Sequence, residues 1–177
     1  KTMTLNRKET DSRFHIPALV RAIRDVQPDI VHSRNWAAVE AVVAGWLVRS
    51  CALVHSEHGV SDANAAEPWR RVWFRRLAFE LADQVLSVSC QLRDLHAKRT
   101  RFPAERIGVL YNGVDSDRFF PDAAARNRIR EELHLSSDTF CVGCVGSLLP
   151  VKDHMTMLRS LVQVDGQCPD WRLLLIG

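Results

Sequence analysis

The sequence lacks any uninterrupted apolar run of about 18 residues, so it predicts no membrane-spanning helix. It also lacks an apolar segment behind the charged residues 1–8, which argues against a secretory signal peptide. Internal repeats and low-complexity segments are absent as well. The net charge of +3 is small and the basic residues are spread over several predicted elements, which argues against nucleic acid as a partner.

Cysteine is scarce and unpatterned. The five cysteines, at positions 51, 90, 141, 144 and 168, are odd in number and scattered. Without a secretory signal they indicate free thiols in a reducing compartment, so we expect a cytoplasmic protein. Hydrophobic residues make up 46% of the chain and charged residues 25%, which is typical of a soluble globular protein.

Both ends of the sequence resemble positions inside a longer chain. The first residue is not Met, and residues 171–177 stop where a buried strand would meet its next loop. We therefore expect the chain to be a piece of a longer protein.

Short apolar segments alternate with helical patterns over the first two thirds of the chain. Helical spacing predicts helices over residues 16–26, 36–48 and 68–82, with Ser33 or Asn35 as N-cap of the second and Ser89 capping a later one. Strands are predicted over residues 29–32, 53–58, 84–89 and 107–111. This alternation predicts an α/β fold with a parallel sheet and helices on both faces. Ligands of such sheets bind at the carboxyl ends of the strands.

The pattern changes after Tyr111. Residues 112–115 predict a turn that needs positive φ, and residues 123–134 predict an amphipathic helix. Residues 139–146 then start a new strand–loop–helix unit. We place a domain boundary near Pro121, which divides the chain into residues 1–120 and 121–177.

The most informative loop is VGSLLPVKDH, residues 145–154, between a predicted strand and a predicted helix. Gly146 lets the backbone approach a ligand closely, and the following helix N-terminus favours a phosphate group. Lys152 adds a positive charge just before that helix. The alternative is an ordinary connecting loop, with Lys152 solvated and Asp153 capping the helix.

Several motifs resemble those of the retaining glycosyltransferase family four. The GSLLPVKDH loop resembles its donor loop, YNGVD at residues 111–115 its interdomain segment, and SEHG at residues 56–59 a loop with a catalytic-site histidine. More narrowly, LNRK at residues 5–8, DIVHSRNW at 29–36 and HSEHG at 55–59 resemble the exosortase/PEP-CTERM-associated exopolysaccharide sugar transferases.

The resemblance implies a GT-B-like fold of two Rossmann-like domains with parallel sheets, both incomplete in this chain. It also implies transfer of a sugar from a nucleotide-sugar donor to a glycan or lipid-linked acceptor, without a cofactor or a metal. Lys152 would pair with the departing diphosphate, and His58 would lie beside the transferred sugar. The remaining implied site residues are Gly146, Ser147 and Asn112 for donor binding and Glu57 as an acid/base candidate.

The match also has gaps. The family usually has an arginine where this sequence has Ser147, so one positive charge is missing. The family's first glycine-rich loop and its paired glutamates lie outside residues 1–177. We therefore expect this chain alone to be inactive.

Residues 69–79, WRRVWFRRLAF, suggest a surface role. Arg71 and Arg75 are four residues apart and share one helix face, and one interpretation is a basic, aromatic surface that touches anionic lipid at the inner membrane face. The alternative is a core helix whose arginine stems lie over apolar neighbours.

Two other functions are open from the sequence. HSE at residues 55–57 and CVGC at 141–144 superficially resemble a zinc deaminase. Side chains three apart in a strand point to opposite faces, which argues against a shared metal. A non-catalytic nucleotide-sugar-binding protein of the same fold is the second alternative, because a fold alone does not establish activity.

Overall fold

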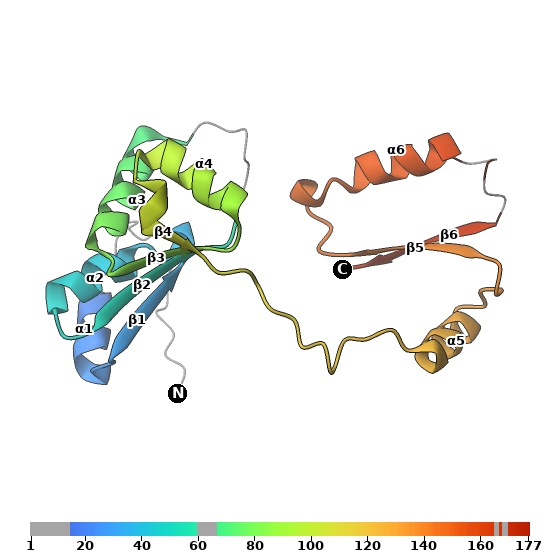
Figure 1. Cartoon of the computed structure of the whole chain (residues 1–177), viewed down its shortest axis with the longest axis horizontal. Coiled ribbons are helices and arrows are strands. Elements are labelled where there is room, and N and C mark those ends of the chain that lie inside the picture. The colour runs from blue at the N-terminus through green and yellow to red at the C-terminus, as the bar shows by residue number, and fades with distance from the viewer. Residues whose placement is uncertain (1–14, 60–66, 165–166, 168–169) are drawn as a thin grey trace. The chain divides into compact units, whose positions relative to one another are not determined.

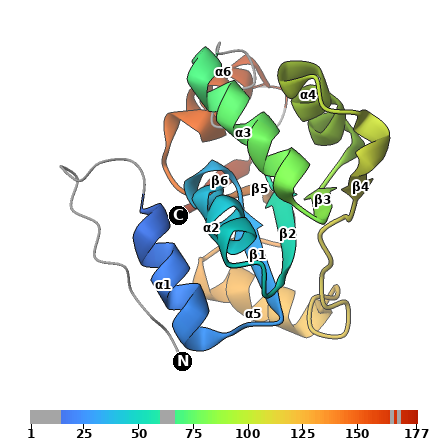
Figure 2. The ribbon, with the colours of Figure 1, turned by 90° about the vertical axis from the view of Figure 1, so that its left-hand side faces the viewer.

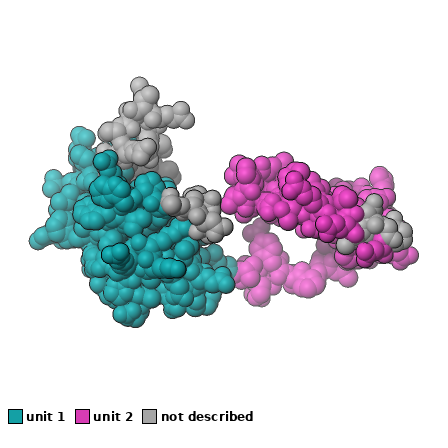
Figure 3. All heavy atoms as spheres, turned by 90° about the horizontal axis from the view of Figure 1, so that it is seen from above, with its two compact units in different colours: residues 1–113 teal, residues 114–177 magenta. Residues whose placement is uncertain are grey.

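The computed structural model describes residues 15–59, 67–164, 167 and 170–177. The predictions that concern residues 5–8 and Cys168 lie outside this part. The chain divides into two compact units, Lys1–Gly113 and Val114–Gly177 (Figure 3). This division falls within the connection between two regular elements, a few residues before the boundary predicted near Pro121.

Unit 1 is a parallel sheet with helical connections (Figure 1). Its four strands lie in the order β1-β2-β3-β4, and every neighbouring pair is parallel. In chain order its elements are α1 (Ile16–Val26), β1 (Ile30–Arg34), the 3-10 helix η1 (Trp36–Ala38), α2 (Glu40–Val48), β2 (Ala52–Glu57), α3 (Trp69–Leu81), β3 (Gln84–Ser87), α4 (Cys90–Thr100), η2 (Ala104–Arg106) and β4 (Ile107–Val109). The predicted α/β class and parallel sheet are confirmed.

The helices cover one face of this sheet. α1 lies beside α2 and α3 beside α4 (Figure 1 and Figure 2). The core consists of Val39, Val42, Leu53, Ala78, Phe79, Ala82, Val85, Phe102 and Ile107. In β1 the even-numbered side chains are exposed and Ser33 is buried, and β3 likewise buries only its odd-numbered positions.

The prediction of helices on both faces is wrong for the described part of unit 1. The strand order advances in one direction without a reversal. Because parallel crossovers are right-handed, each connecting helix returns on the same face.

The helix caps differ from the prediction at one position and agree at another. Neither Ser33 nor Asn35 caps a helix: Ser33 is buried within β1, and Asn35 precedes η1 without a side-chain capping bond. Ser89 does cap α4, because its hydroxyl accepts a hydrogen bond from the Leu92 amide at 3.1 Å.

Unit 2 has two parallel strands, β5 (Phe140–Val145) and β6 (Trp171–Ile176). Its helices are α5 (Ala123–Glu132), the 3-10 helix η3 (Pro150–Lys152) and α6 (His154–Val164). α5 begins at an Asp122 cap whose carboxylate accepts from the amides of Ala124 and Ala125. The predicted new strand–loop–helix unit is therefore present.

The turn predicted at residues 112–115 is absent. This stretch has no turn assignment, and Gly113 does not have positive φ. The turn lies at residues 116–118 instead, where the Asp115 carboxylate accepts from the amides of Asp117 and Arg118 at 3.1 and 3.2 Å. An acidic side chain, not a glycine, makes the chain turn here. Among the described residues, no helix has the length and apolarity needed to cross a bilayer.

Candidate functional site

The carboxyl ends of β1 and β2 bring a set of polar side chains together. Arg34 and Ser56 are register partners, and His58 follows β2 directly. The Arg34 guanidinium donates to Nδ1 of His58 at 3.1 Å, and Nε2 of His58 lies 3.0 Å from Oγ of Ser56. Oγ of Ser56 is in turn 2.8 Å from Nε2 of His32. We call these four residues the histidine chain.

Asn35 fixes the position of His58 through the backbone. Its Oδ1 accepts from the His58 amide at 2.7 Å, and its own amide donates to the Ser56 carbonyl at 2.9 Å. Asn35 does so with φ of 56°, a region that non-glycine residues rarely occupy. The strained residue thus joins the end of β1 to the loop that carries the predicted site histidine.

The opposite side of β2 carries His55 and Glu57, both buried. Oγ of Ser33 lies 2.6 Å from Nδ1 of His55, whose Nε2 lies 3.3 Å from Oε1 of Glu57. His55 therefore has different partners from His58, as expected for residues three apart in a strand. The structure favours His58 over His55 for contact with a ligand, because His58 is only partly buried and His55 is fully buried.

Glu57 belongs to a buried ion cluster with His55, His96, Arg75 and Glu67. The Arg75 Nε donates to Glu57 at 2.9 Å, and its NH1 group donates to Glu67 at 2.5 Å. Burial raises the pKa of Glu57, but the hydrogen bond with His55 and the charges of His96 and Arg75 bring the pKa below its ordinary value. A carboxylate held ionised in this way has no proton to give at neutral pH, and its two oxygens already face His55, Arg75 and His96, so it is not accessible as a base either. The suggested acid/base role of Glu57 therefore has no support in its surroundings.

The predicted lipid contact by Arg75 is wrong, because its side chain is only 2% exposed and pairs with two carboxylates. Arg71 is also drawn inward: it pairs with Glu67 at 3.0 Å and lies over the Trp36 ring at 4.7 Å. α3 instead turns Trp69 and Trp73 outward, with exposed fractions of 72% and 60%. α3 thus turns its arginine face inward and its tryptophan face outward, because Glu57 and Glu67 pair with the guanidinium groups.

In unit 2 the predicted donor residues lie at the carboxyl end of β5. The Lys152 stem lies along Gly146, where a Cβ would be 3.7 Å from Lys152 Cε. Gly146 also donates its amide to the Ile176 carbonyl at 2.7 Å, and Ser147 is exposed next to it. Among the described residues, the Lys152 ammonium forms no ion pair. A free positive charge thus stands beside a glycine, at a strand end and before a helix.

Two further features shape this strand end. Asp153 caps α6, with its Oδ1 accepting from the Thr156 amide at 3.3 Å, which is the cap expected in the alternative of an ordinary connecting loop. Gly177 follows β6, and a Cβ there would lie 2.5 Å from the Gly146 carbonyl oxygen, so only glycine fits without movement. Asn112, the remaining predicted donor residue, is exposed in the stretch after β4.

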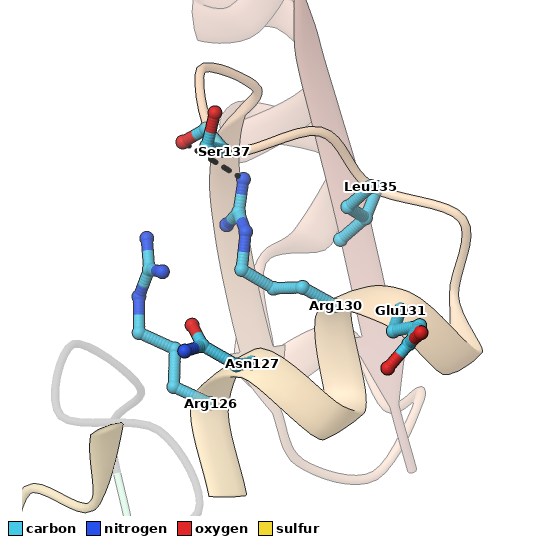
Figure 4. A pocket seen from close by; sticks show the side chains of 6 residues that line it. All are labelled: Arg126, Asn127, Arg130, Glu131, Leu135 and Ser137. Carbon is cyan, nitrogen blue, oxygen red and sulfur yellow. Dashed lines mark hydrogen bonds between the residues drawn. The ribbon is translucent and has the colours of Figure 1, made fainter. Parts of the chain in front are cut away.

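A hollow elsewhere in unit 2 lies beside α5 (Figure 4). Arg126, Asn127, Arg130, Glu131, Leu135 and Ser137 line it. The Arg130 guanidinium donates to the carbonyls of Ser136 and Thr139, the latter at 2.7 Å, just before β5 begins. The hollow therefore lies at the amino end of β5, away from Gly146, and its arginine stabilises the turn.

No group of three or more metal-ligating side chains is found among the described residues. Cys141 and Cys144 are free thiols in β5, and His55 and Glu57 are occupied by the buried ion cluster. The superficial zinc deaminase pattern thus has no assembled ligand set within the part of the chain that is described.

The model of Glycosyltransferase Family 4 matches residues 2–118, so the chain belongs to this family. It is 33% identical over 144 residues to the GDP-mannose-dependent alpha-(1-6)-phosphatidylinositol monomannoside mannosyltransferase of Mycolicibacterium smegmatis, covering 80% of this chain and 37% of that protein. It is 30% identical over 161 residues to the D-inositol 3-phosphate glycosyltransferase of Mycobacterium leprae, covering 84% and 35%. The chain thus spans about a third of the length of these relatives.

Solved structures agree on the fold. Anabaena HepE in complex with UDP-glucose matches with a TM-score of 0.73 and 20% identity, over 90% of this chain and 42% of that one. The sucrose-phosphate synthase of Thermosynechococcus elongatus matches with a TM-score of 0.68 and 22% identity, over 92% and 41%. The predicted GT-B-like α/β fold is confirmed by these similarities.

The sequence pointed to His58 as a candidate site residue but not to the side chains that surround it. Arg34, Ser56 and His32 lie in the motifs that carry the family resemblance but received no role of their own, and Asn35 was considered only as a helix N-cap. The available signal was the strand alternation, which places His32 and Arg34 on the same face of β1. The register with β2, which brings Ser56 next to Arg34, could not be read from the sequence.

Proposed function

We propose that the protein containing this chain is a retaining glycosyltransferase of the hexosyltransferase type. It would transfer a sugar from a nucleotide-sugar donor to a glycan or lipid-linked acceptor, with an exopolysaccharide or its precursor as product. Family membership supports the class of reaction. A relative that uses GDP-mannose and a structural neighbour that binds UDP-glucose support a nucleotide-sugar donor.

The observation that carries the proposal is the free Lys152 charge beside Gly146 at the start of α6. As the glycosidic bond to the donor breaks, negative charge develops on the departing diphosphate. Lys152 and the amides at the N-terminus of α6 would stabilise that charge, so the proposed reaction uses no metal. Gly146 and Gly177 have no side chains at the ends of β5 and β6, so a phosphate would be able to approach the backbone there.

The test is sugar transfer by the protein from the complete reading frame that encodes this chain. Lys152→Met should lower transfer about 100-fold, the usual effect of losing one donor to a developing oxyanion. Lys98→Met, which removes an exposed lysine from α4, is the matched control and should change little. Equal effects of the two substitutions would reject the role of Lys152. Donor binding without any transfer would instead support the non-catalytic relative, in line with Ser147 replacing the usual arginine.

We further propose that the protein works at the cytoplasmic face of the membrane and touches it through α3. The exposed Trp69 and Trp73 are four residues apart on one face, and Arg70 lies over the Trp69 ring at 5.5 Å. Aromatic rings with a neighbouring cation suit the interface of an anionic bilayer. In co-sedimentation with anionic vesicles, Trp69→Ala with Trp73→Ala should reduce binding more than Trp46→Ala, which removes a single and less exposed ring that also has an arginine over it. Unchanged binding of the double variant would reject this surface.

A further inference from the structure

The histidine chain begins at a group that can only donate. A guanidinium has no acceptor, so the bond from Arg34 to Nδ1 of His58, at 3.1 Å, requires a lone pair on that nitrogen. A neutral His58 ring then carries its hydrogen on Nε2. That hydrogen points to Oγ of Ser56, 3.0 Å away, so the first two bonds of the chain have a defined direction.

The hydroxyl of Ser56 determines the direction of the next hydrogen bond, to His32. The residue is 4% exposed, and its hydroxyl has a single hydrogen to donate. Since its Oγ already accepts from His58, the acceptor within reach is Nε2 of His32 at 2.8 Å. His32 therefore holds a lone pair on Nε2 and its hydrogen on Nδ1. This is the tautomer that a free histidine side chain in water disfavours.

We propose that Arg34, Ser56 and His32 are positioning residues that hold His58 neutral, with Nδ1 prepared to accept a hydroxyl hydrogen. This inference rests on the proposed function, in which His58 lies beside the transferred sugar. A sugar hydroxyl that reaches Nδ1 would take the place of Arg34 as donor and would find the lone pair already there. The ring needs no change of tautomer and no reorientation when the sugar arrives.

The charges around His58 favour the same state. Arg34 and His32 approach from β1, and Glu57 is the neighbouring carboxylate on β2. Burial of the ring lowers the pKa of His58 first, Arg34 and His32 lower it further, and Glu57 opposes them. A proton on Nδ1 would also displace the Arg34 hydrogen bond and leave two cations in contact. The ring therefore acts as a polar neutral group and not as an acid at neutral pH.

The test is NMR of the complete protein that contains this chain, with 15N-labelled histidine, recorded at pH 7.5 through two-bond 15N–1H couplings. His58 should show a protonated Nε2 and an unprotonated Nδ1, and His32 the reverse pattern. A His32 ring with its hydrogen on Nε2, or a His58 ring with its hydrogen on Nδ1, would overturn the proposal. The wild-type spectrum alone decides this, so the test does not depend on any variant folding.

Variants then assign the cause. Ser56→Ala removes the bridge, so His32 should shift toward the Nε2–H form while His58 keeps its own. Arg34→Met should raise the pKa of His58 in a pH titration, whereas Arg21→Met, at an exposed position of α1, should leave it unchanged. A His58 pKa that does not differ between these two variants contradicts the role of Arg34. These spectra involve no sugar, so a complete protein that is inactive but has the expected tautomers would reject the proposed function and the contact with a sugar hydroxyl, and would leave the positioning of the His58 ring by Arg34, Ser56 and His32 in place.

Discussion

Arg75→Met tests whether the buried ion cluster stabilises unit 1. Arg75 is 2% exposed and joins Glu57 of β2 to Glu67, which precedes α3. Methionine keeps much of the volume but leaves Glu57 buried with only His55 and His96 as partners. Removing one member of a buried ion pair typically costs about 3–5 kcal/mol of the free energy of unfolding, because the remaining charge is uncompensated. For a unit of this size, that is a fall in Tm of about 12–20 °C, at about 4 °C per kcal/mol.

The assay is urea and thermal unfolding followed by tryptophan fluorescence. Trp36 lies close to Arg75, with the guanidinium carbon 5.5 Å from the ring centre, so its emission should respond to unfolding around the cluster. Arg70→Met is the matched control, since Arg70 is one exposed residue of the same helix. A surface change of this kind usually alters stability by less than about 0.5 kcal/mol.

The pH dependence supplies a second check on Arg75→Met. The charge of Arg75 is one of the causes that lower the pKa of Glu57, so its loss raises that pKa. Glu57 can then become neutral at a higher pH than in the wild type, so the difference in unfolding free energy between wild type and variant should shrink as the pH falls. If Arg75→Met costs no more than Arg70→Met at pH 7, the reasoning about the cluster is wrong.

Three further predictions concern other parts of the structure. Burial lowers the pKa of His96 despite the nearby Glu57, so below pH about 6.5 the unfolded state binds more protons than the folded state and stability falls as the pH drops. His96→Phe should flatten this slope in urea unfolding measured at several pH values. An unchanged slope would contradict this role of His96. Asn35→Gly relieves backbone strain of about 1–3 kcal/mol but removes the hydrogen bond to the His58 amide, so the global free energy of unfolding should change little. Hydrogen exchange at the His58 amide should become faster. Equal exchange rates in wild type and variant would count against the role of Asn35. Gly177→Ala in the complete protein places a methyl group against the Gly146 carbonyl at a cost of about 1–3 kcal/mol. Calorimetry should then show nucleotide-sugar binding weakened about tenfold or more. Unchanged affinity would refute the importance of the close packing of Gly177 against Gly146 for donor binding.

Much of the fold could be predicted from the sequence because its signals are local. Apolar strands such as β2 and β3, the helix spacing in α1 and the Ser89 cap all depend on residues close together in the chain. The face covered by the helices depends instead on strand order, which is a property of the whole sheet. Helices on both faces could be expected only as long as that order was unknown.

The orientation of α3 shows the same limit at the level of side chains. Its sequence has a tryptophan face with Trp69 and Trp73 and an arginine face with Arg71 and Arg75, and periodicity alone favours burying the tryptophans. The outcome was decided by Glu57, 18 positions before Arg75, and by Glu67, 8 positions before it. A partner that lies in another element leaves no trace in the helix's own pattern.

The site was predictable to a similar extent. Lys152 and Gly146 lie within one loop, so their proximity followed from chain connectivity. The partners of His58 come from β1 and depend on the parallel register between Arg34 and Ser56, which only the folded sheet defines.

Among the described residues of unit 1, the helices lie on one face of the sheet, and the side chains of β1 on the other face affect contact between copies at high concentration. On β1 the side chain of Ile30 is 60% exposed, and His32 and Arg34 follow it along the same face. The exposed Ile30 side chain favours apolar contact between copies, while the positive charges of Arg34 on the two copies oppose close stacking. Self-association of the isolated chain should therefore respond to salt as well as to concentration, and screening of these charges would promote it. Residues of β1 therefore affect both the self-association of the chain and the hydrogen bonds of the histidine chain.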